Sequence, residues 1–106
     1  MYTRKLTMKL KAKSAPEFAR IVENEILPLL RKQQGFLDQI TFFVAPERKE
    51  ALAISFWETK ENFEAYNRTD FPEVLKSLAK VLEGTPEAEA LELSSSTFHK
   101  LAAQGA

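Results

Sequence analysis

The sequence has no cysteine, one histidine and three glycines among its 106 residues. The lack of cysteine excludes disulfides, thiolate metal sites and a cysteine nucleophile. With a single histidine, a transition-metal site would have to use carboxylates, and their spacing in the sequence predicts no such site. The sequence also contains no glycine-rich phosphate loop, no nucleotide fingerprint and no G-x-S-x-G motif.

The sequence also has no excess of positive or negative charge. Lys plus Arg and Asp plus Glu are 15 each, so the formal net charge is zero. Nucleic-acid-binding proteins normally carry a basic excess, so we expect no nucleic-acid partner. No apolar run approaches the roughly 20 residues that span a bilayer, and no signal peptide is visible. We therefore expect a soluble cytoplasmic protein with one domain over residues 1–99 and a frayed tail over residues 100–106.

The first part of the chain predicts a strand followed by an interrupted helix. Residues 4–11 alternate between apolar and polar side chains, which is typical of a half-buried strand. A helix starts at Ser14, where Glu17 has the spacing of a capping box. Pro28 should kink this helix or end its regular part, and Gly35 should stop it.

Two further strands should form a hairpin. Residues 36–45 are rich in β-branched and aromatic types, and residues 51–57 form another apolar run. Only the charged turn 46–50 separates them, so they are expected to pair with each other.

The last part of the chain predicts a broken helix and a final strand. Thr59 should cap the helix, and a polar stretch interrupts it before Asp70. Asp70 and Glu73 have capping-box spacing again, and Gly84 should end the second half. Residues 90–98 are predicted to form the last strand.

The order β-α-β-β-α-β predicts an α+β, ferredoxin-like domain. It has a four-stranded antiparallel sheet with the helices on one face, the second helix being broken. The other face would leave an exposed apolar patch, which a second copy of the chain could cover, so we expect a homodimer. Depending on the phase of the strands, the large apolar side chains on that face are Phe43, Leu37 and Trp57, or Phe42, Ile40 and Phe36.

With these elements, residues 2–99 resemble the antibiotic biosynthesis monooxygenase family, within the dimeric α+β barrel superfamily. The resemblance rests on Pro28-Leu29-Leu30, Gly35-Phe36, Phe56-Trp57-Glu58-Thr59, Phe63, Tyr66 and Asp70-Phe71. It implies a small monooxygenase that needs no cofactor and acts on a flat, phenol-like or quinol-like aromatic molecule.

The chain departs from the family at several polar positions. Many relatives have histidines where this chain has Tyr66 and Asp70. The haem-degrading branch has Asn, Trp and His where this chain has Arg4, Tyr66 and Lys76. Arg and Lys cannot replace a neutral histidine as a haem ligand, so we expect no haem turnover and no cofactor.

Four residues are candidates for ligand binding, and the sequence assigns no catalytic residue. Tyr66 shares a helix face with Phe63 and could donate a hydrogen bond to a ligand oxygen, or could simply be buried with a wet hydroxyl. Trp57 could stack on a flat ligand, or pack in the core or a dimer interface. His99 could act as a base, although its place at a strand end favours a solvated or interface residue.

Charged residues of the first strand also allow two interpretations. Lys5, Lys9 and Lys11 share one strand face, where they could attract an anionic ligand or simply remain solvated.

Two functions of different classes therefore remain open. One is the monooxygenase. The other is a dimeric binding or regulatory module that has kept the barrel and lost the chemistry. A cavity lined by Tyr66 and another polar group would favour the enzyme, whereas a cleft filled by Phe side chains would favour the module.

Overall fold

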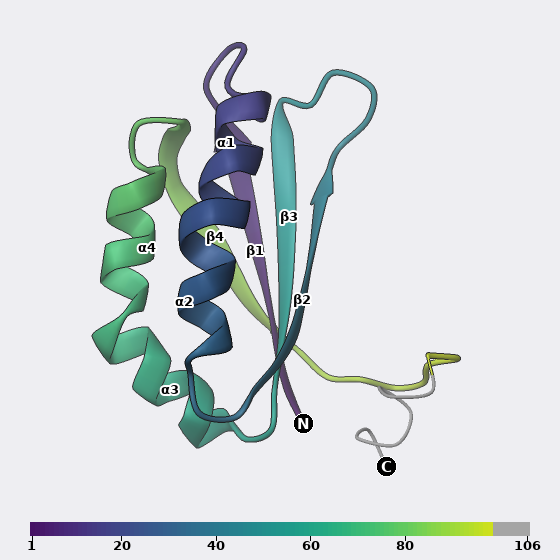
Figure 1. Ribbon diagram of the computed structural model, residues 1–106. Coiled ribbons are helices and arrows are strands. Elements are labelled where there is room, and N and C mark those ends of the chain that lie inside the picture. The colour runs from purple at the N-terminus through teal and green to yellow at the C-terminus, as the bar shows by residue number, and fades with distance from the viewer. Residues whose placement is uncertain (99–106) are drawn as a thin grey trace.

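The computed structural model describes residues 1–98 as four strands and two interrupted helical segments (Figure 1). The elements are β1 (Tyr2–Leu10), α1 (Ala15–Ile21), the π-helix η1 (Val22–Ile26), α2 (Leu27–Arg31), β2 (Phe36–Phe43), β3 (Glu50–Trp57), α3 (Lys60–Thr69), α4 (Phe71–Leu78) and β4 (Leu82–Leu91). No helix in this part of the chain is long and apolar enough to span a bilayer. His99 and the predicted tail 100–106 lie outside the described residues.

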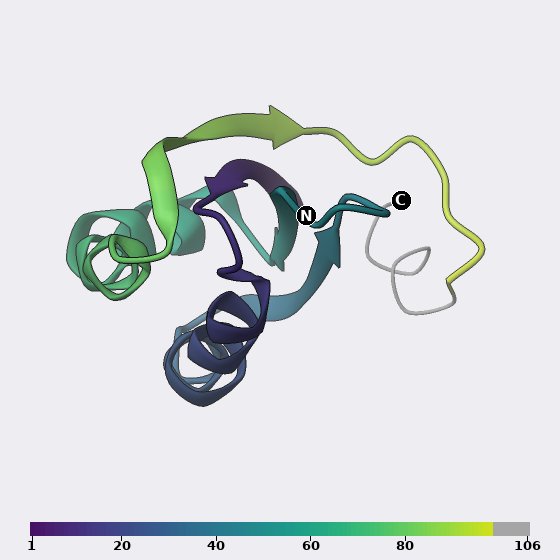
Figure 2. The ribbon, with the colours of Figure 1, turned by 90° about the horizontal axis from the view of Figure 1, so that it is seen from above.

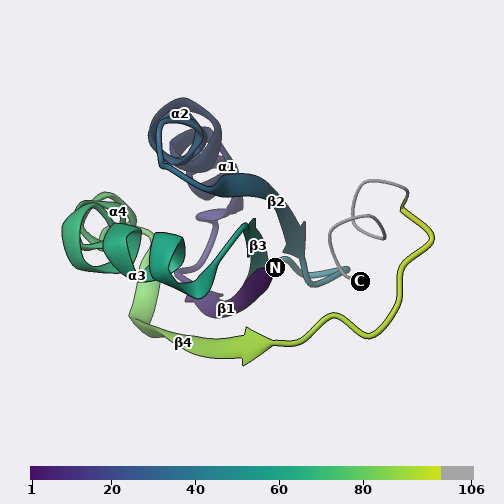
Figure 3. The same ribbon diagram turned by 90° about the horizontal axis from the view of Figure 1, so that it is seen from below.

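The four strands form one antiparallel sheet in the order β2-β3-β1-β4. All helices lie on one side of this curved sheet, and the other side carries no element of the described chain (Figures 2 and 3). The expected ferredoxin-like α+β fold is therefore confirmed.

The core fills the space between the helices and the sheet. Its largest fully buried side chains are Trp57, Phe18, Met8, Ile21 and Leu30. They come from β1, β3 and the first helical segment. Phe63 and Tyr66 of α3 and Val74 and Leu78 of α4 are buried as well, so burial of apolar surface fixes both helical segments against the sheet.

The first helical segment changes its winding just before Pro28. The Leu27 N–H donates to the carbonyl of Val22, five residues back, and η1 forms there. Pro28 has no N–H to offer the preceding turn, so a regular α-helix would lose a hydrogen bond at this point. The expected irregularity thus takes the form of a π-helical turn, after which α2 continues to Arg31.

The capping predictions have different outcomes. Thr59 has an extended backbone, and its side chain accepts a hydrogen bond from the Asn62 N–H at 3.0 Å, as expected. The capping boxes expected at Ser14 and Asp70 are wrong. Both residues have helical backbone angles, which turn the side chain away from the amides of the first turn. Glu17 instead pairs with Arg20, and Asp70 Oδ2 accepts a hydrogen bond from Gln33 Nε2 at 2.6 Å.

The boundaries of the last strand were also predicted wrongly. β4 runs over Leu82–Leu91 rather than residues 90–98, and the helix before it ends at Leu78 instead of continuing to Gly84. Gly84 has a φ of +74° and lies where the pairing register between β1 and β4 shifts, so it marks a bulge and not a helix end. β4 is an edge strand in which residues 87–90 alternate Glu with Ala. Because alanine is small, this alternation is a weak sequence signal for a strand.

Neither of the two predicted sets of residues describes the open face of the hairpin completely. Phe42 lies opposite Leu52 and Ile40 opposite Ile54 on the open face. Phe43 instead contacts Phe18 on the helix side, with ring centroids 5.8 Å apart.

A register shift in β2 explains the mixture of phases. The shift lies between Phe36 and Asp38 and breaks the strict alternation of faces along the strand. Phe36 therefore contacts Trp57 on the helix side (5.3 Å), although Ile40 and Phe42 face the other way.

Candidate functional site

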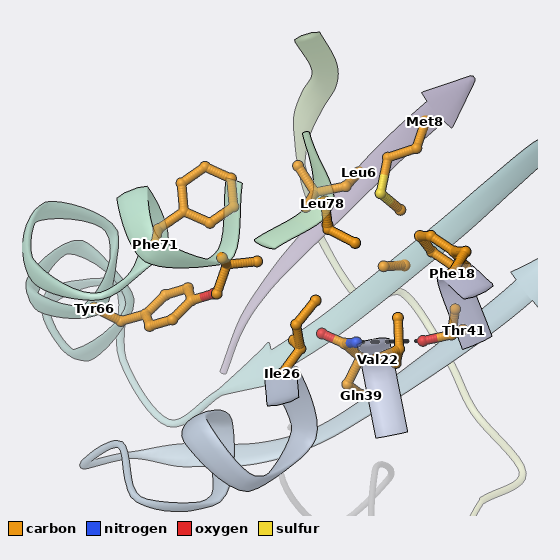
Figure 4. Close-up of a pocket in the computed structure, with 12 residues that line it drawn as sticks. Leu6, Met8, Phe18, Val22, Ile26, Gln39, Thr41, Tyr66, Phe71 and Leu78 are labelled. Atoms are coloured by element: carbon orange, nitrogen blue, oxygen red, sulfur yellow. Dashed lines mark hydrogen bonds between the residues drawn. The ribbon is translucent and has the colours of Figure 1, made fainter. Parts of the chain in front are cut away.

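A cleft lies between the helical layer and the sheet (Figure 4). Its inner part, of about 30 Å³, is mostly apolar and is lined by Leu6, Met8, Phe18, Val22, Ile26, Gln39, Thr41, Ala53, Tyr66, Phe71, Val74 and Leu78. These residues come from α1, η1, α3, α4 and the inner face of three strands. The cleft therefore exists only in the folded chain.

An outer part of about 240 Å³ continues the cleft toward solvent. The two parts share Phe18, Val22, Gln39 and Thr41, so they form one cleft that opens between the first helical segment and the edge strand β2. Glu23 of η1 is the single carboxylate that lines this outer part among the described residues.

Tyr66 is the ionisable side chain of the inner part. Its phenol points from α3 into the space between helices and sheet (Figure 4). Burial raises the pKa of Tyr66, an effect that the Arg4 guanidinium opposes and Asp70 reinforces. The hydroxyl makes no hydrogen bond within residues 1–98 and, unlike Thr3 Oγ1, it is not sealed from solvent. Tyr66 is therefore a neutral donor facing the cleft.

Polar groups from β2 face Tyr66 across the cleft. Gln39 Nε2 donates to Thr41 Oγ1 at 3.2 Å, and both residues line the inner and the outer parts. We did not identify them from the sequence. A signal was present, because two polar residues of the same parity interrupt a strand that is otherwise rich in Phe and Ile.

The π-helical turn contributes Val22 and Ile26 to the wall of the cleft (Figure 4). In a regular helix these residues, four apart, would lie nearly above one another. The wider turn changes that spacing, so the sequence position of Pro28 affects the shape of the cleft. Single π-turns within α-helices are frequent at functional sites.

Trp57 lies in the core and does not line the cleft. It is 0% exposed, and its indole Nε1 donates to Ser55 Oγ at 3.1 Å. Its ring centroid lies 5.0 Å from that of Tyr66 and 5.8 Å from that of Phe63. Trp57 therefore supports Tyr66 from behind, as the packing interpretation expected.

Phe63 belongs to the same aromatic cluster but faces a different surface. It stacks on Tyr2 with centroids 5.1 Å apart and lines a depression beside β4, away from the cleft. Of the four predicted candidates, the structure thus places one in the cleft, two in the aromatic cluster behind it, and His99 outside the described residues.

Arg4 has the least expected position. It is 9% exposed, lies on the helix side of β1 and donates from Nη1 to Asn67 Oδ1 at 3.0 Å. Its guanidinium carbon lies 4.8 Å from the centre of the Phe63 ring and 4.4 Å from that of Phe71. Burial lowers the pKa of Arg4. Lys76 of α4, in contrast, is exposed.

Solved structures match the chain closely in fold and weakly in sequence. No protein-family model matches the sequence, and no curated protein sequence matches it. The cofactor-independent oxygenase SnoaB from Streptomyces nogalater has a TM-score of 0.76 at 14% identity, over 92% of this chain and 97% of that chain. The fold is that of the antibiotic biosynthesis monooxygenases.

Two other members of this group are similar to the same extent. A Bordetella bronchiseptica protein provisionally assigned as an antibiotic biosynthesis monooxygenase has a TM-score of 0.78 at 14% identity, over 89% of this chain and 97% of that chain. The Streptomyces coelicolor monooxygenase ActVA-Orf6, solved with nanaomycin D, has a TM-score of 0.72 at 16% identity, over 92% and 90%. The resemblance noted from the sequence is confirmed at the level of fold.

Proposed function

We propose that this protein is a cofactor-independent monooxygenase that acts on a flat, phenol-like or quinol-like aromatic molecule. One observation carries the proposal: a neutral phenol, Tyr66, enters an otherwise apolar cleft opposite the polar pair Gln39 and Thr41. Apolar walls with a few convergent polar groups are typical of small-molecule sites.

The shape of the cleft suits a planar ring that carries oxygen at its edge. Leu6, Met8 and Phe71 offer apolar surface, and Tyr66 can donate to a ligand oxygen. The inner part is narrow, so a ligand of more than one ring would extend into the outer part, past Gln39 and Thr41. SnoaB and ActVA-Orf6, which share the fold, are an oxygenase and a monooxygenase.

The reaction can be balanced without a bound cofactor. An electron-rich phenol in its keto form carries a CH₂ group, which loses a proton and reacts with O₂ to form a C–O bond. The resulting hydroperoxide loses water, so CH₂ and O₂ become C=O and H₂O. Tyr66 stays protonated because burial raises its pKa, so its role is to donate a hydrogen bond to the oxyanion, and not to act as the base. The CH₂ proton passes to Glu23, the carboxylate that lines the outer part of the cleft, and is returned to the peroxide oxygen before water leaves.

The alternative is a binding module without chemistry. The small inner volume of about 30 Å³ favours it, because little room remains for a ligand and O₂ together beside Tyr66. Such a module would bind the same planar ligands and leave them unchanged.

We also propose that a second copy of the chain covers the open face of the sheet. Phe42 and Val44 are 49% and 43% exposed there, and Ile40, Leu52 and Ile54 are half-buried beside them. No described element covers these residues, and a contiguous apolar patch of this kind usually marks an interface.

Replacing Tyr66 by phenylalanine should weaken ligand binding about fivefold, while the free energy of unfolding changes by no more than about 1 kcal/mol. The ring keeps its contacts with Trp57, and only the hydroxyl is lost. Binding of 1,4-naphthoquinone can be followed by quenching of Trp57, the single tryptophan.

A matched control is Tyr2→Phe, since Tyr2 packs on Phe63 and does not line the cleft. If Tyr66→Phe and Tyr2→Phe bind the quinone equally well, Tyr66 has no role in recognition.

A further inference from the structure

Arg4 is a buried cation that has no carboxylate partner among residues 1–98. None of the carboxylates in residues 1–98 lies within 4 Å of its guanidinium, whereas several exposed Lys and Arg side chains have such a partner. Within the described chain, its side chain makes one hydrogen bond, to the neutral Asn67. Burying a charge costs free energy unless it is paired and hydrogen-bonded, and five donors are too many for one amide oxygen.

The guanidinium is reachable from a surface depression of about 260 Å³. The stacked rings of Tyr2 and Phe63 line this depression together with Ala88 and Ala90 of β4. The alanines matter because larger side chains at these edge positions would cover Arg4. None of the residues that line the cleft of Tyr66 lines this depression, so the two sites are separate.

The chemistry of the depression selects a particular anion. Asn67 accepts from Arg4 with its Oδ1, and its Nδ2 makes no hydrogen bond within the described chain, so an amide donor remains available beside the guanidinium. Planar, paired donors match a carboxylate. Glu89 at the rim, 3.7 Å from Lys5, disfavours a doubly charged phosphate. The aromatic rings and alanine methyl groups that line the depression suit a ligand whose carboxylate is attached to an apolar group.

We propose that Arg4 and Asn67 form a binding site for the carboxylate of a small aromatic monocarboxylic acid, distinct from the oxygenase cleft. Arg4 supplies the charge, Asn67 adds an N–H donor, and the body of the acid packs on Tyr2 and on the alanines of β4. Phe71 separates the two sites, since its ring lies 4.4 Å from Arg4 and also lines the cleft.

The test is a titration of the full chain with benzoate, followed by two-dimensional amide NMR. Saturable shifts are expected at residues 2–4, at 88–90 and at the Asn67 side-chain NH₂. Arg4→Met, which keeps the length and removes the charge, should weaken benzoate binding about tenfold or more. Asn67→Asp should weaken benzoate binding to a similar extent without altering the core, because the new carboxylate would pair with the Arg4 guanidinium and so compete with benzoate.

Two controls make the result specific. Benzyl alcohol has the same ring without the charge and should not bind at the same concentrations. Lys9→Met removes a positive charge from the opposite face of β1, at a residue that does not line the depression, and should leave benzoate binding within about twofold. The proposal is overturned if benzoate does not saturate, if benzyl alcohol binds equally well, or if Asn67→Asp binds benzoate as tightly as the unaltered chain.

Discussion

Replacing Gly35 by alanine should lower the free energy of unfolding by about 2–5 kcal/mol. Gly35 has a φ of +78°, in the left-handed region that alanine rarely adopts. An added Cβ would also lie 2.2 Å from Asn62 Oδ1 and 2.6 Å from Asn62 Cβ. The Cβ of Asn62 cannot rotate away, so the first turn of α3 would have to move as a whole. That turn is fixed by Thr59, which accepts a hydrogen bond from the Asn62 N–H.

Gly84→Ala is the matched control for this prediction. Gly84 has almost the same backbone angle, with a φ of +74°, but an added Cβ would meet no atom within 4 Å. Only the backbone strain remains, so the expected loss is about 1 kcal/mol. Urea unfolding at one fixed protein concentration, followed by Trp57 fluorescence, measures both variants. Equal losses for the two substitutions would show that Gly35 and α3 are not in close contact.

Replacing Phe42 by lysine should convert a dimer into a monomer. In the unaltered chain we expect about twice the 12.1 kDa chain mass by sedimentation or light scattering at micromolar concentration. Phe42 projects from the open face of edge strand β2 beside Leu52 and is 49% exposed. Burying an unpaired lysine within an apolar interface costs several kcal/mol, so the variant should sediment at the mass of one chain.

The substitution should leave the single chain folded, because Phe42 contributes little to the core on the helix side. Ala65→Lys adds the same charge on the exposed side of α3 and should remain a dimer. A monomeric unaltered chain, or a Phe42→Lys variant that stays dimeric, would contradict an interface on the open face.

The sequence predicted the fold better than the site. Periodicity indicates which side chains are buried, but it does not indicate which side chains from distant parts of the chain contact one another. Alternation in residues 4–11, the hairpin and the broken second helix were sufficient for the ferredoxin-like topology. The register shift in β2 and the bulge at Gly84 were not predictable in this way, since each depends on the neighbouring strand.

The site was predicted only in part, for a related physical reason. Tyr66 was identified from its helical position, but Gln39 and Thr41 meet it only after the edge strand folds against the helices. Arg4 has the same strand parity as Leu6 and Met8, so the alternation was consistent with its burial, although we did not predict it. Only the structure shows that it lies between two aromatic rings and that no carboxylate of residues 1–98 lies beside it.

The proposed reaction can be tested most directly with isotopically labelled oxygen. The protein is incubated with 1-naphthol under ¹⁸O₂, with a chelator and no added cofactor, and the products are identified by mass spectrometry. Monooxygenation predicts 1,4-naphthoquinone that contains one ¹⁸O atom, one O₂ consumed per product, and a several-fold slower reaction for Tyr66→Phe than for Tyr2→Phe. If 1-naphthol binds in the cleft but is oxidised no faster than in a blank without protein, the result would contradict the monooxygenase and favour the binding module.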